Sequence, residues 1–341
     1  MNRTILLTLD YELFFAKSGT AEKSIIEPTN KLIEVLKELR IPATFFVDTM
    51  YLAALQSSPD TKNQRTFSFI KNQLQEIIKS GSRIELHLHP HWIDAAYGDG
   101  LWEFPTLKHY KLSSLTSEQL EAAFSEGIKI LHDIAREVYP NYQVACFRAG
   151  GWCIEPFSII KSLMEKHNIY ADSSVCPGLY MNGSIHKIDY RDIKMSSFYR
   201  FSGNVRSCEI NGKFLEIPVN GFVVNAWDRF LWLLKSRIFY NDSVIWGDGV
   251  GIPSIYNQGR LNKFIALLKN ESYYSQFSLD NYVDKKLLNK IMKATSYTLI
   301  TFVAHPKTIT KSSLDAIRYF KSKGYAFSTL QKVANENIQN I

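Results

Sequence analysis

Short runs of consecutive apolar residues alternate along this chain with longer stretches in which apolar residues recur every three or four positions. A short run is typical of a buried strand, and the longer spacing is typical of a helix with one apolar face. Their alternation predicts an α/β fold built on a parallel sheet. We expect strands at Ile5–Asp10, Ala43–Asp48, Arg83–His89, Val144–Arg148, Ile169–Ser173, Phe214–Val219, Leu299–His305 and Ala326–Leu330. We expect helices at Glu27–Arg40, Phe67–Lys79, Ser117–Tyr139, Pro156–His167 and Ser312–Lys323.

Eight strands joined by helices fit either a barrel or an open doubly wound sheet. An open sheet that binds a dinucleotide carries a GxGxxG pattern after its first strand, but Leu9-Asp10-Tyr11-Glu12 stands there. Phosphate-loop and GxSxG patterns are absent from the sequence as well. Dehydrogenase, kinase and serine hydrolase functions are therefore excluded.

The stretch from about 196 to 289 interrupts the alternation. Within it, Glu209–Phe214 predicts a hairpin with an Asn-Gly turn. Ala226–Tyr240 combines two tryptophans with large apolar residues and cations, which fits either a helix packed on the sheet or a helix resting on an anionic membrane. Because no flexible linker or repeat divides the sequence, we expect one domain over residues 1–341, with 196–289 as an insertion or cap.

Composition narrows the class of protein. The 341 residues are 45% hydrophobic and 21% charged, which excludes wholesale disorder. No apolar stretch is long enough to span a membrane, and the N-terminus has no signal-peptide pattern, so we expect a cytoplasmic protein. The four cysteines form no CxxC pair and are expected to be reduced thiols. The net charge of +7 is scattered, without the basic run of a nucleic-acid tail.

Polar residues gather where the expected strands end, at the edge where parallel barrels build active sites. One acid at a strand end is commonly a helix cap, but agreement among several strand ends favours a site. These residues are Asp10 and Glu12 at the end of the first strand, His87, His89 and His91 at the end of the third, Arg148 at the end of the fourth, Asp172 at the end of the fifth and His305 at the end of the seventh.

Three histidines within five residues favour a metal site, because clustered imidazoles repel one another once protonated and are costly to bury. Strand periodicity points His87 and His89 to one side, whereas Pro90 ends the strand and lets His91 turn back. Spacing alone therefore leaves two pairings, His87 with His89 or His87 with His91.

Two histidines and one carboxylate form a set that leaves positions open for water and substrate. Asp10 and Glu12 are two residues apart, so they share one face of a strand and can divide the work. One would bind the metal and the other would act as a general base. A nearby Arg148 would keep the base ionised, and His305 could act as a general acid from the opposite side.

Six short motifs occur in order along the chain: Leu7-Thr8-Leu9-Asp10-Tyr11-Glu12, Ala43-Thr44-Phe45-Phe46-Val47, His87-Leu88-His89-Pro90-His91, Phe147-Arg148-Ala149-Gly150-Gly151, Asp172-Ser173-Ser174 and Val303-Ala304-His305-Pro306. Together they resemble the polysaccharide deacetylase family, also called the NodB-homology or carbohydrate esterase 4 group. Within that family, the chain is most similar to members associated with bacterial O-antigen and capsule synthesis. The resemblance spans Ile5 to about Leu330, apart from 196–289.

The resemblance implies a distorted (β/α)7–8 barrel of the NodB type. It also implies one divalent metal ion, usually zinc, with cobalt, nickel, manganese or iron as alternatives. By position, Glu12 matches the metal carboxylate, and His87 and His91 match the two metal histidines, which the family spaces four apart. Two positions depart from the family pattern. Glu12 stands where the metal-binding carboxylate is usually an Asp, and Leu88 stands where the family usually has Ser or Thr.

The same resemblance implies that Asp10 is the catalytic base, that Arg148 orients it and that His305 is the catalytic acid. The Asp/Trp motif that tunes the family's catalytic histidine is not identifiable in the sequence. Gly150 stands where the family's arginine motif has a proline. The candidate substrate-binding residues are Trp92, Gly150, Trp152 and Asp172, with the two tryptophans able to stack on a sugar ring.

The sequence thus predicts a metal-dependent hydrolase that removes an N-acetyl or related N-acyl group from a sugar of a bacterial surface polysaccharide or its precursor. The acetamido sugar could be carried on a polymer, a lipid or a nucleotide. The alternatives are a metal-independent barrel glycoside hydrolase, which needs two carboxylates, and a non-catalytic sugar-binding protein on the same scaffold. We expect no nucleic-acid partner, and peripheral contact with an anionic inner membrane through Ala226–Tyr240.

Overall fold

The protein, described by a computed structural model over residues 3–183, 185–252, 269 and 271–338, is built around one nine-stranded sheet. Its strands are β1 (Thr4–Tyr11), β2 (Thr44–Asp48), β3 (Arg83–Leu88), β6 (Cys146–Ala149), β7 (Ala171–Asp172), β10 (Tyr199–Phe201), β11 (Phe214–Glu216), β14 (Leu299–Ala304) and β15 (Ala326–Ser328). They lie in the order β10-β11-β7-β6-β3-β2-β1-β14, with β15 also paired to β1. All pairs are parallel except β10 with β11.

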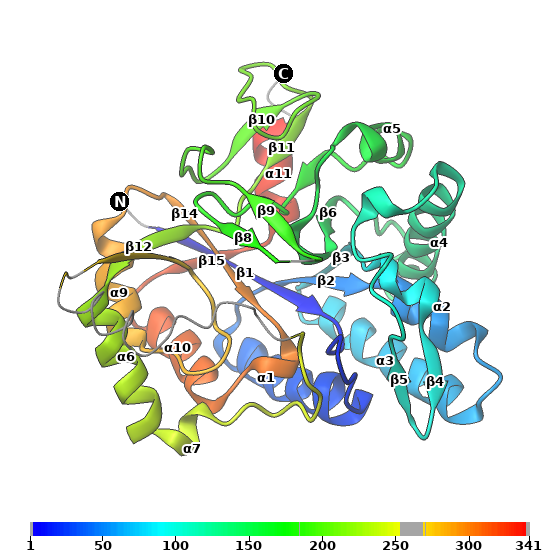
Figure 1. Ribbon diagram of the computed structural model, residues 1–341, viewed down its shortest axis with the longest axis horizontal. Coiled ribbons are helices and arrows are strands. Elements are labelled where there is room, and N and C mark those ends of the chain that lie inside the picture. The colour runs from blue at the N-terminus through cyan, green and yellow to red at the C-terminus, as the bar shows by residue number, and fades with distance from the viewer. Residues whose placement is uncertain (1–2, 184, 253–268, 270, 339–341) are drawn as a thin grey trace.

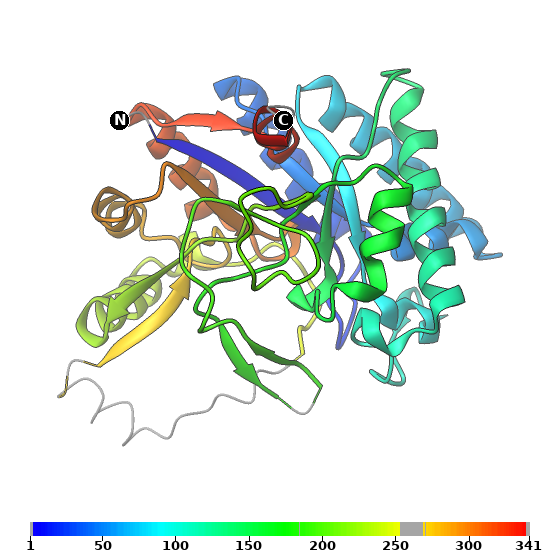
Figure 2. The same ribbon diagram turned by 90° about the horizontal axis from the view of Figure 1, so that it is seen from above.

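Three two-stranded sheets lie beside the main sheet. They are β4 (Ala96–Gly98) with β5 (Leu101–Glu103), β8 (Tyr180–Asn182) with β9 (Lys187–Asp189), and β12 (Gly221–Asn225) with β13 (Ser272–Gln276). Figures 1 and 2 show helices along the outer side of the curled main sheet. The α-helices are α1 (Glu27–Leu39), α2 (Thr49–Ser57), α3 (Thr61–Lys79), α4 (Ser117–Arg136), α5 (Ser158–Lys166), α6 (Ala226–Ile238), α7 (Tyr240–Ser243), α9 (Lys285–Ala294), α10 (Lys311–Ser322) and α11 (Leu330–Ile338).

The α/β class and the eight strands expected from the sequence are confirmed. Helix α3 begins six residues earlier than expected because the Asp60 side chain accepts a hydrogen bond from the Lys62 N–H and caps it. The turn near Asn211 is present, but β11 pairs with β10, so the hairpin is longer than the expected Glu209–Phe214. Helices α2, α9 and α11 were not expected.

The stretch 196–289 is only partly separate from the main sheet. It supplies β10 and β11 to that sheet and adds β12, α6, α7 and β13 beside it. Residues 253–268 and 270 of the expected insertion lie outside the described residues. The boundaries of the expected insertion stay a prediction.

Asn220, in the segment that follows β11, connects that side of the curled sheet to β14 at the other side. The Asn220 N–H donates to the Thr301 carbonyl on β14, and the Asn220 carbonyl accepts from the Phe277 N–H. On the other side, the Ile217 N–H donates to the Asp172 carbonyl of β7. The result is a distorted barrel in which, among the described residues, isolated hydrogen bonds and no full ladder span the last gap.

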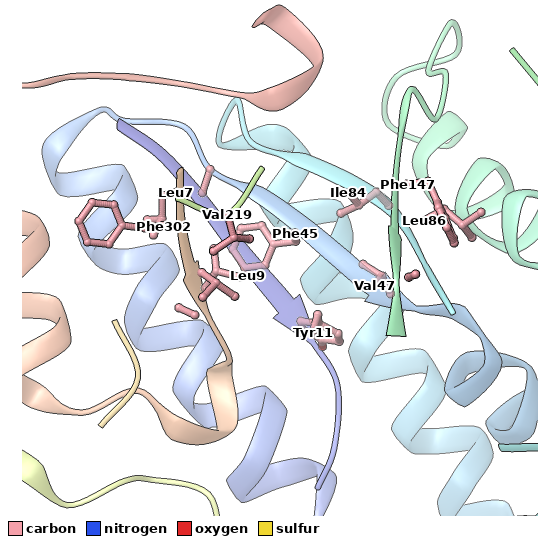
Figure 3. Packing of buried hydrophobic residues seen from close by; sticks show 14 of the residues in the cluster. Leu7, Leu9, Tyr11, Phe45, Val47, Ile84, Leu86, Phe147, Val219 and Phe302 are labelled. Atoms are coloured by element: carbon pink, nitrogen blue, oxygen red, sulfur yellow. The ribbon is translucent and has the colours of Figure 1, made fainter. Parts of the chain in front are cut away.

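The two faces of β1 have different surroundings, as the strand period of two requires. Leu7, Leu9 and Tyr11 belong to the large apolar cluster that lies between the sheet and the helices, and Figure 3 shows them beside residues of β2 and β14. The alternate residues Leu6 and Thr8 point into the curled sheet.

Helix α11 fills the amino-terminal half of the barrel interior. Leu330 and Val333 of this helix pack in one cluster with Leu6, Phe46 and Cys146 of the strands. This apolar plug closes one end of the barrel, so the polar residues that follow Leu6 on the inner face are left at the carboxyl-terminal end.

Asn220→Ala should test the joint between the sheet ends. The Asn220 side chain accepts from the Thr301 N–H at 2.7 Å and donates to the Ser196 carbonyl at 2.9 Å, and Asn220 is buried. Removing it leaves a buried N–H without a partner, so we expect a loss of about 1–3 kcal/mol in the free energy of unfolding.

Chemical denaturation is the measurement. Asn241→Ala, at an exposed position, is the matched control, with an expected change within about 0.5 kcal/mol. Equal stabilities of the two variants would contradict the role of Asn220.

Candidate active site

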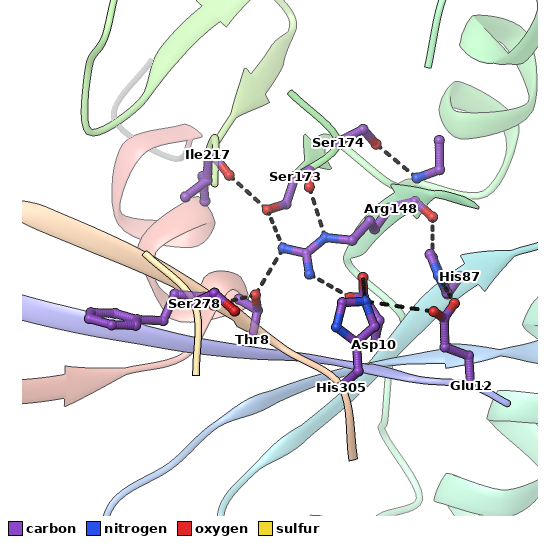
Figure 4. A network of polar contacts seen from close by, with 12 residues as sticks. Thr8, Asp10, Glu12, His87, Arg148, Ser173, Ser174, Ile217, Ser278 and His305 are labelled. Carbon is purple, nitrogen blue, oxygen red and sulfur yellow. Dashed lines mark hydrogen bonds and ion pairs between the residues drawn. The ribbon is translucent and has the colours of Figure 1, made fainter. Parts of the chain in front are cut away.

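Polar side chains from neighbouring strands converge at the carboxyl-terminal rim of the barrel (Figure 4). They come from the ends of β1, β2, β3, β6 and β14, and all of them are buried except one histidine, which is partly exposed. Parallel pairing of β1 with β2 and β14, and of β3 with β2 and β6, brings these ends together. The residues are Asp10, Glu12, Asp48, His87, His89, Arg148 and His305.

The Arg148 guanidinium lies at the centre of this group and is fully buried. Its Nη1 donates to Asp10 Oδ1 at 2.5 Å, and its Nη2 donates to the hydroxyl oxygens of Thr8 and Ser173 at 2.9 and 2.8 Å. Its Nε donates to the Ser173 carbonyl, and its plane covers the Phe46 ring. Because both hydroxyl groups donate to backbone carbonyls, their oxygens are fixed as acceptors for the arginine.

The two oxygens of Glu12 have different partners. Lys307 Nζ donates to Oε1 at 2.8 Å, while Oε2 lies 3.1 Å from His87 Nε2 and 2.5 Å from His89 Nε2. Burial works against ionisation, but Lys307 and the two histidines outweigh it and hold the pKa of Glu12 well below its usual value. Glu12 is therefore an anion whose Oε2 faces two imidazoles.

His87 has its tautomer set by the backbone. Its Nδ1–H donates to the Arg148 carbonyl at 2.7 Å, and a carbonyl can only accept. In the neutral ring, Nε2 then carries a lone pair directed at Glu12 Oε2. A lone pair facing a carboxylate oxygen is repelled unless a proton or a metal ion lies between them.

His89 and His91 take different directions because Pro90 starts a 3-10 turn (Pro90–Asp94). His89 Nε2 approaches Glu12 without making a hydrogen bond of acceptable geometry. The His91 ring lies against Phe15 and Phe104, with centroids at 4.3 and 4.7 Å, and Phe15 also contacts the His89 ring at 4.4 Å.

Burial, followed by repulsion from His89, lowers the pKa of His91 well below its usual value. Neither of its nitrogens has a hydrogen-bond partner among the described residues. The structure thus groups Glu12 with His87 and His89, and places His91 in an aromatic pocket next to them.

His305 faces the acids from β14. Its Nε2 lies 3.5 Å from Asp10 Oδ2 and 3.6 Å from Glu12 Oε1, and its Nδ1–H donates to Asp280 at 3.0 Å. Burial lowers the pKa of His305, but Asp280 and the two acids outweigh that effect and raise it to about 9. His305 is therefore protonated at neutral pH in the protein without metal.

Asp280 is held by several donors. It accepts the His305 N–H and the Thr308 hydroxyl on one oxygen, and the Ser278 hydroxyl and the His305 ring on the other. The resulting Asp280–His305 pair is the kind that fixes the orientation of a catalytic imidazole.

The four candidate substrate residues have different surroundings. Trp92 is buried, stacks on Tyr51 and donates its indole N–H to Asp48 at 2.5 Å. Asp172 is buried and accepts from the Ser174 N–H and hydroxyl. Trp152 is half-buried, and its carbonyl accepts from a tyrosine hydroxyl.

Gly150, the fourth of these residues, is buried beside His89. A Cβ at this position would come within 2.5 Å of the Leu88 carbonyl oxygen and 2.6 Å of His89 Nδ1. Glycine therefore leaves the space that the His89 ring occupies.

Sequence reasoning missed three charged residues of the site, namely Asp48, Asp280 and Lys307. Asp280 lies in an irregular segment 25 residues before its partner His305, where no motif pointed to it. Burial raises the pKa of Asp48 to about 6; the negative charge of Glu12 adds to this effect, and His89 and His87 oppose it. Asp48 ends β2, so the strand-end rule that found the other residues could have found it.

The donor atoms of Glu12, His87 and His89 fit a divalent metal ion. All three residues are buried, and each has a ligand atom that lies within 4.8 Å of a ligand atom of the other two. One carboxylate oxygen and two imidazole nitrogens are a donor set that zinc and related ions use. Because Lys307 occupies Oε1, Glu12 offers one oxygen.

Residues 2–153 match the family model described as polysaccharide deacetylase. The matched range contains Asp10, Glu12, the histidine cluster and Arg148, and it ends before Asp280 and His305. No curated protein sequence matches the chain significantly.

Solved structures resemble the chain in fold. They include a polysaccharide deacetylase homologue from Mycobacterium smegmatis, at 13% identity and a TM-score of 0.49, covering 98% of this chain and 91% of that one. A family 4 carbohydrate esterase from Streptomyces lividans in complex with acetate has 9% identity, a TM-score of 0.43 and coverage of 98% and 96%. The peptidoglycan deacetylase PdaC from Bacillus subtilis has 11% identity, a TM-score of 0.40 and coverage of 99% and 92%. All three TM-scores are below 0.5.

Asp280→Asn should lower the pKa of His305 from about 9 in the chelator-treated protein, because it removes the anion that stabilises the imidazolium. The raised pKa implies that the charged form stabilises the fold fully below about pH 6.5, and that this contribution is lost as the pH rises toward 9.

Histidine NMR titration would check this, with His305→Gln to assign the signal. Asp133→Asn is the matched control, because Asp133 is exposed and pairs with Lys129 on α4. An unchanged His305 pKa in Asp280→Asn would contradict the prediction.

Proposed function

We propose that the protein is a metal-dependent hydrolase that removes an N-acetyl or related N-acyl group from a sugar of a bacterial surface polysaccharide or its precursor. The observation that carries the proposal is one rim on which a Glu-His-His donor set, an arginine-bound aspartate and an aspartate-bound histidine meet. The match of residues 2–153 to the polysaccharide deacetylase model supports the substrate class.

Asp10 is the proposed general base. Arg148 holds its Oδ1, so Oδ2 faces the site toward His305. A carboxylate fixed in this way can accept the proton of an attacking water without first reorienting. Arg148 is a positioning residue, because its N–H groups are directed at Asp10, Thr8 and Ser173.

His305 is the proposed general acid. Asp280 fixes Nδ1, which leaves the protonated Nε2 directed at the space beside Asp10 and Glu12. Amide hydrolysis needs a proton on the departing nitrogen, since an amide anion is a very poor leaving group. The Asp280 carboxylate beside Nδ1 favours the protonated ring, which is the form that can supply this proton.

Glu12, His87 and His89 are the proposed metal ligands. A divalent ion would supply Lewis-acid chemistry, polarising the acyl carbonyl and lowering the pKa of water. The family resemblance implies His91 in place of His89, but His91 packs between Phe15 and Phe104. Contact of His89 Nε2 with Glu12 favours His89.

Trp152 is the proposed sugar contact among the four candidates. It is half-buried and lies two residues after Gly150, the glycine that packs against the His89 ring. Trp92 and Asp172 are already engaged with Asp48 and Ser174 in the interior. An exposed aromatic face beside the rim is the common way to hold a sugar ring.

Acetate release tests the function. The purified protein would be assayed on N-acetylglucosamine oligomers and on a nucleotide-linked N-acetyl sugar. We expect acetate from at least one of them, loss of release after chelator treatment, and recovery with zinc. Glycosidic cleavage that persists in chelator would establish the glycoside hydrolase alternative. Metal and sugar binding without acetate release would establish a non-catalytic binding protein.

Metal analysis of variants tests the ligand set. We expect His87→Ala and His89→Ala to lose the metal and His91→Ala to retain it, because only the first two rings reach Glu12. Asp10→Asn is the matched control, which should keep stoichiometric metal while acetate release falls about 10²–10⁴-fold. If His91→Ala loses the metal and His89→Ala keeps it, the ligand pair is His87 with His91, as the family resemblance implies.

A further inference from the structure

Helix α6 packs on the protein through a mixed face that carries Arg229, Trp232 and Lys235. The Trp232 indole N–H donates to the Tyr282 carbonyl at 3.0 Å, and Lys235 Nζ donates to Asp284 at 2.5 Å. The Arg229 guanidinium lies over the ring of Tyr273. Helices on a globular surface normally turn their apolar face to the core.

The opposite face of α6 is an exposed apolar stripe. Its members are spaced three or four residues apart and so lie on one side of the helix. They range from 42% exposed for Leu234 to 66% for Ile238. We call this face the α6 stripe, and it consists of Trp227, Phe230, Leu231, Leu234 and Ile238.

The apolar surface extends beyond the α6 stripe. Leu233, Phe239 and Tyr240 are also exposed, and so is Val223 on the neighbouring strand β12. Figure 1 shows α6 and α7 at the outer margin of the molecule. A row of large exposed apolar side chains such as the α6 stripe marks, on a folded protein, a contact with a partner or a membrane.

The chemistry of this surface favours a membrane. Trp227 and Tyr240 stand at the two ends of the segment, and amphipathic aromatic rings are enriched at membrane–water interfaces. Arg237 borders the stripe and is exposed, and the whole chain carries a charge of +7. The apolar surface is also wider than the narrow seam of a coiled coil. Among the described residues, no helix is long and apolar enough to cross a bilayer.

We propose that α6 lies in the headgroup region of an anionic bilayer with the α6 stripe inserted among the lipid chains. Apolar burial supplies the binding energy. Arg237 and the net charge of +7 supply attraction to the anionic surface and its dependence on salt. The proposal is independent of the reaction at the barrel rim.

Vesicle co-sedimentation with the full chain tests the proposal. We expect binding to vesicles that contain phosphatidylglycerol at low salt, weaker binding at high salt, and little binding to pure phosphatidylcholine. The double variant Leu231→Ser with Leu234→Ser should weaken binding by at least ~10-fold, because two apolar side chains no longer enter the bilayer. Phe69→Ser is the matched control, since Phe69 is an exposed apolar residue on α3.

Arg237→Glu keeps the apolar surface and reverses one charge on it. We expect it to fold normally by circular dichroism and to bind the anionic vesicles more weakly, so the test stands even where the double variant does not fold. The proposal is overturned if the intact protein ignores anionic vesicles at low salt, or if Arg237→Glu binds them as well as the native chain. It is also overturned if light scattering shows a dimer that the double variant abolishes, because the occupant of the stripe is then a second copy.

Discussion

The Arg148 guanidinium sits inside the barrel without exposed surface, and its surroundings are arranged to keep that charge there. A buried cation without partners costs several kcal/mol, and breaking a buried ion pair typically costs about 3–5 kcal/mol. Asp10 supplies the opposite charge, and further oxygens come from Thr8 on the same strand β1 and from Ser173 directly after β7. The Arg148 carbonyl, in turn, sets the tautomer of His87. One residue of β6 thus fixes both the proposed base and one proposed metal ligand.

Pairing of β1 with β14 provides the other constraint on the rim. The register places Leu9 opposite Ala304, so the residues that follow each strand meet. His305 then faces Asp10 and Glu12, and Lys307 reaches Glu12 from the 3-10 turn (Pro306–Thr308). The chain brings together residues almost 300 positions apart because its first strand and a late strand are neighbours in the sheet. The apolar plug of α11 at the opposite end leaves this rim as the polar end of the barrel.

Much of the fold followed from local patterns. Apolar runs located the strands because most of them, apart from β15, are buried on both faces. Strand period separated Thr8 and Asp10 from Leu7 and Leu9. The curled sheet was expected, but its closure through Asn220 was not, because a single asparagine in an irregular segment leaves no periodic signal. The expected start of α3 was too late. The first turn, which Asp60 caps, is mostly polar and therefore shows no apolar periodicity.

The sequence by itself determined which chemical groups collect at strand ends: the two acids after β1, the histidine cluster, Arg148 and His305. Such groups can be listed because strand direction and period are local properties. Only the tertiary structure decided which of them touch. It turned His91 away between aromatic rings, brought Asp280 to His305 and Lys307 to Glu12, and set α6 with its apolar stripe outward. These outcomes depend on packing between segments far apart in the chain, and hydrophobic periodicity reports which face of a helix is apolar but not what lies against it.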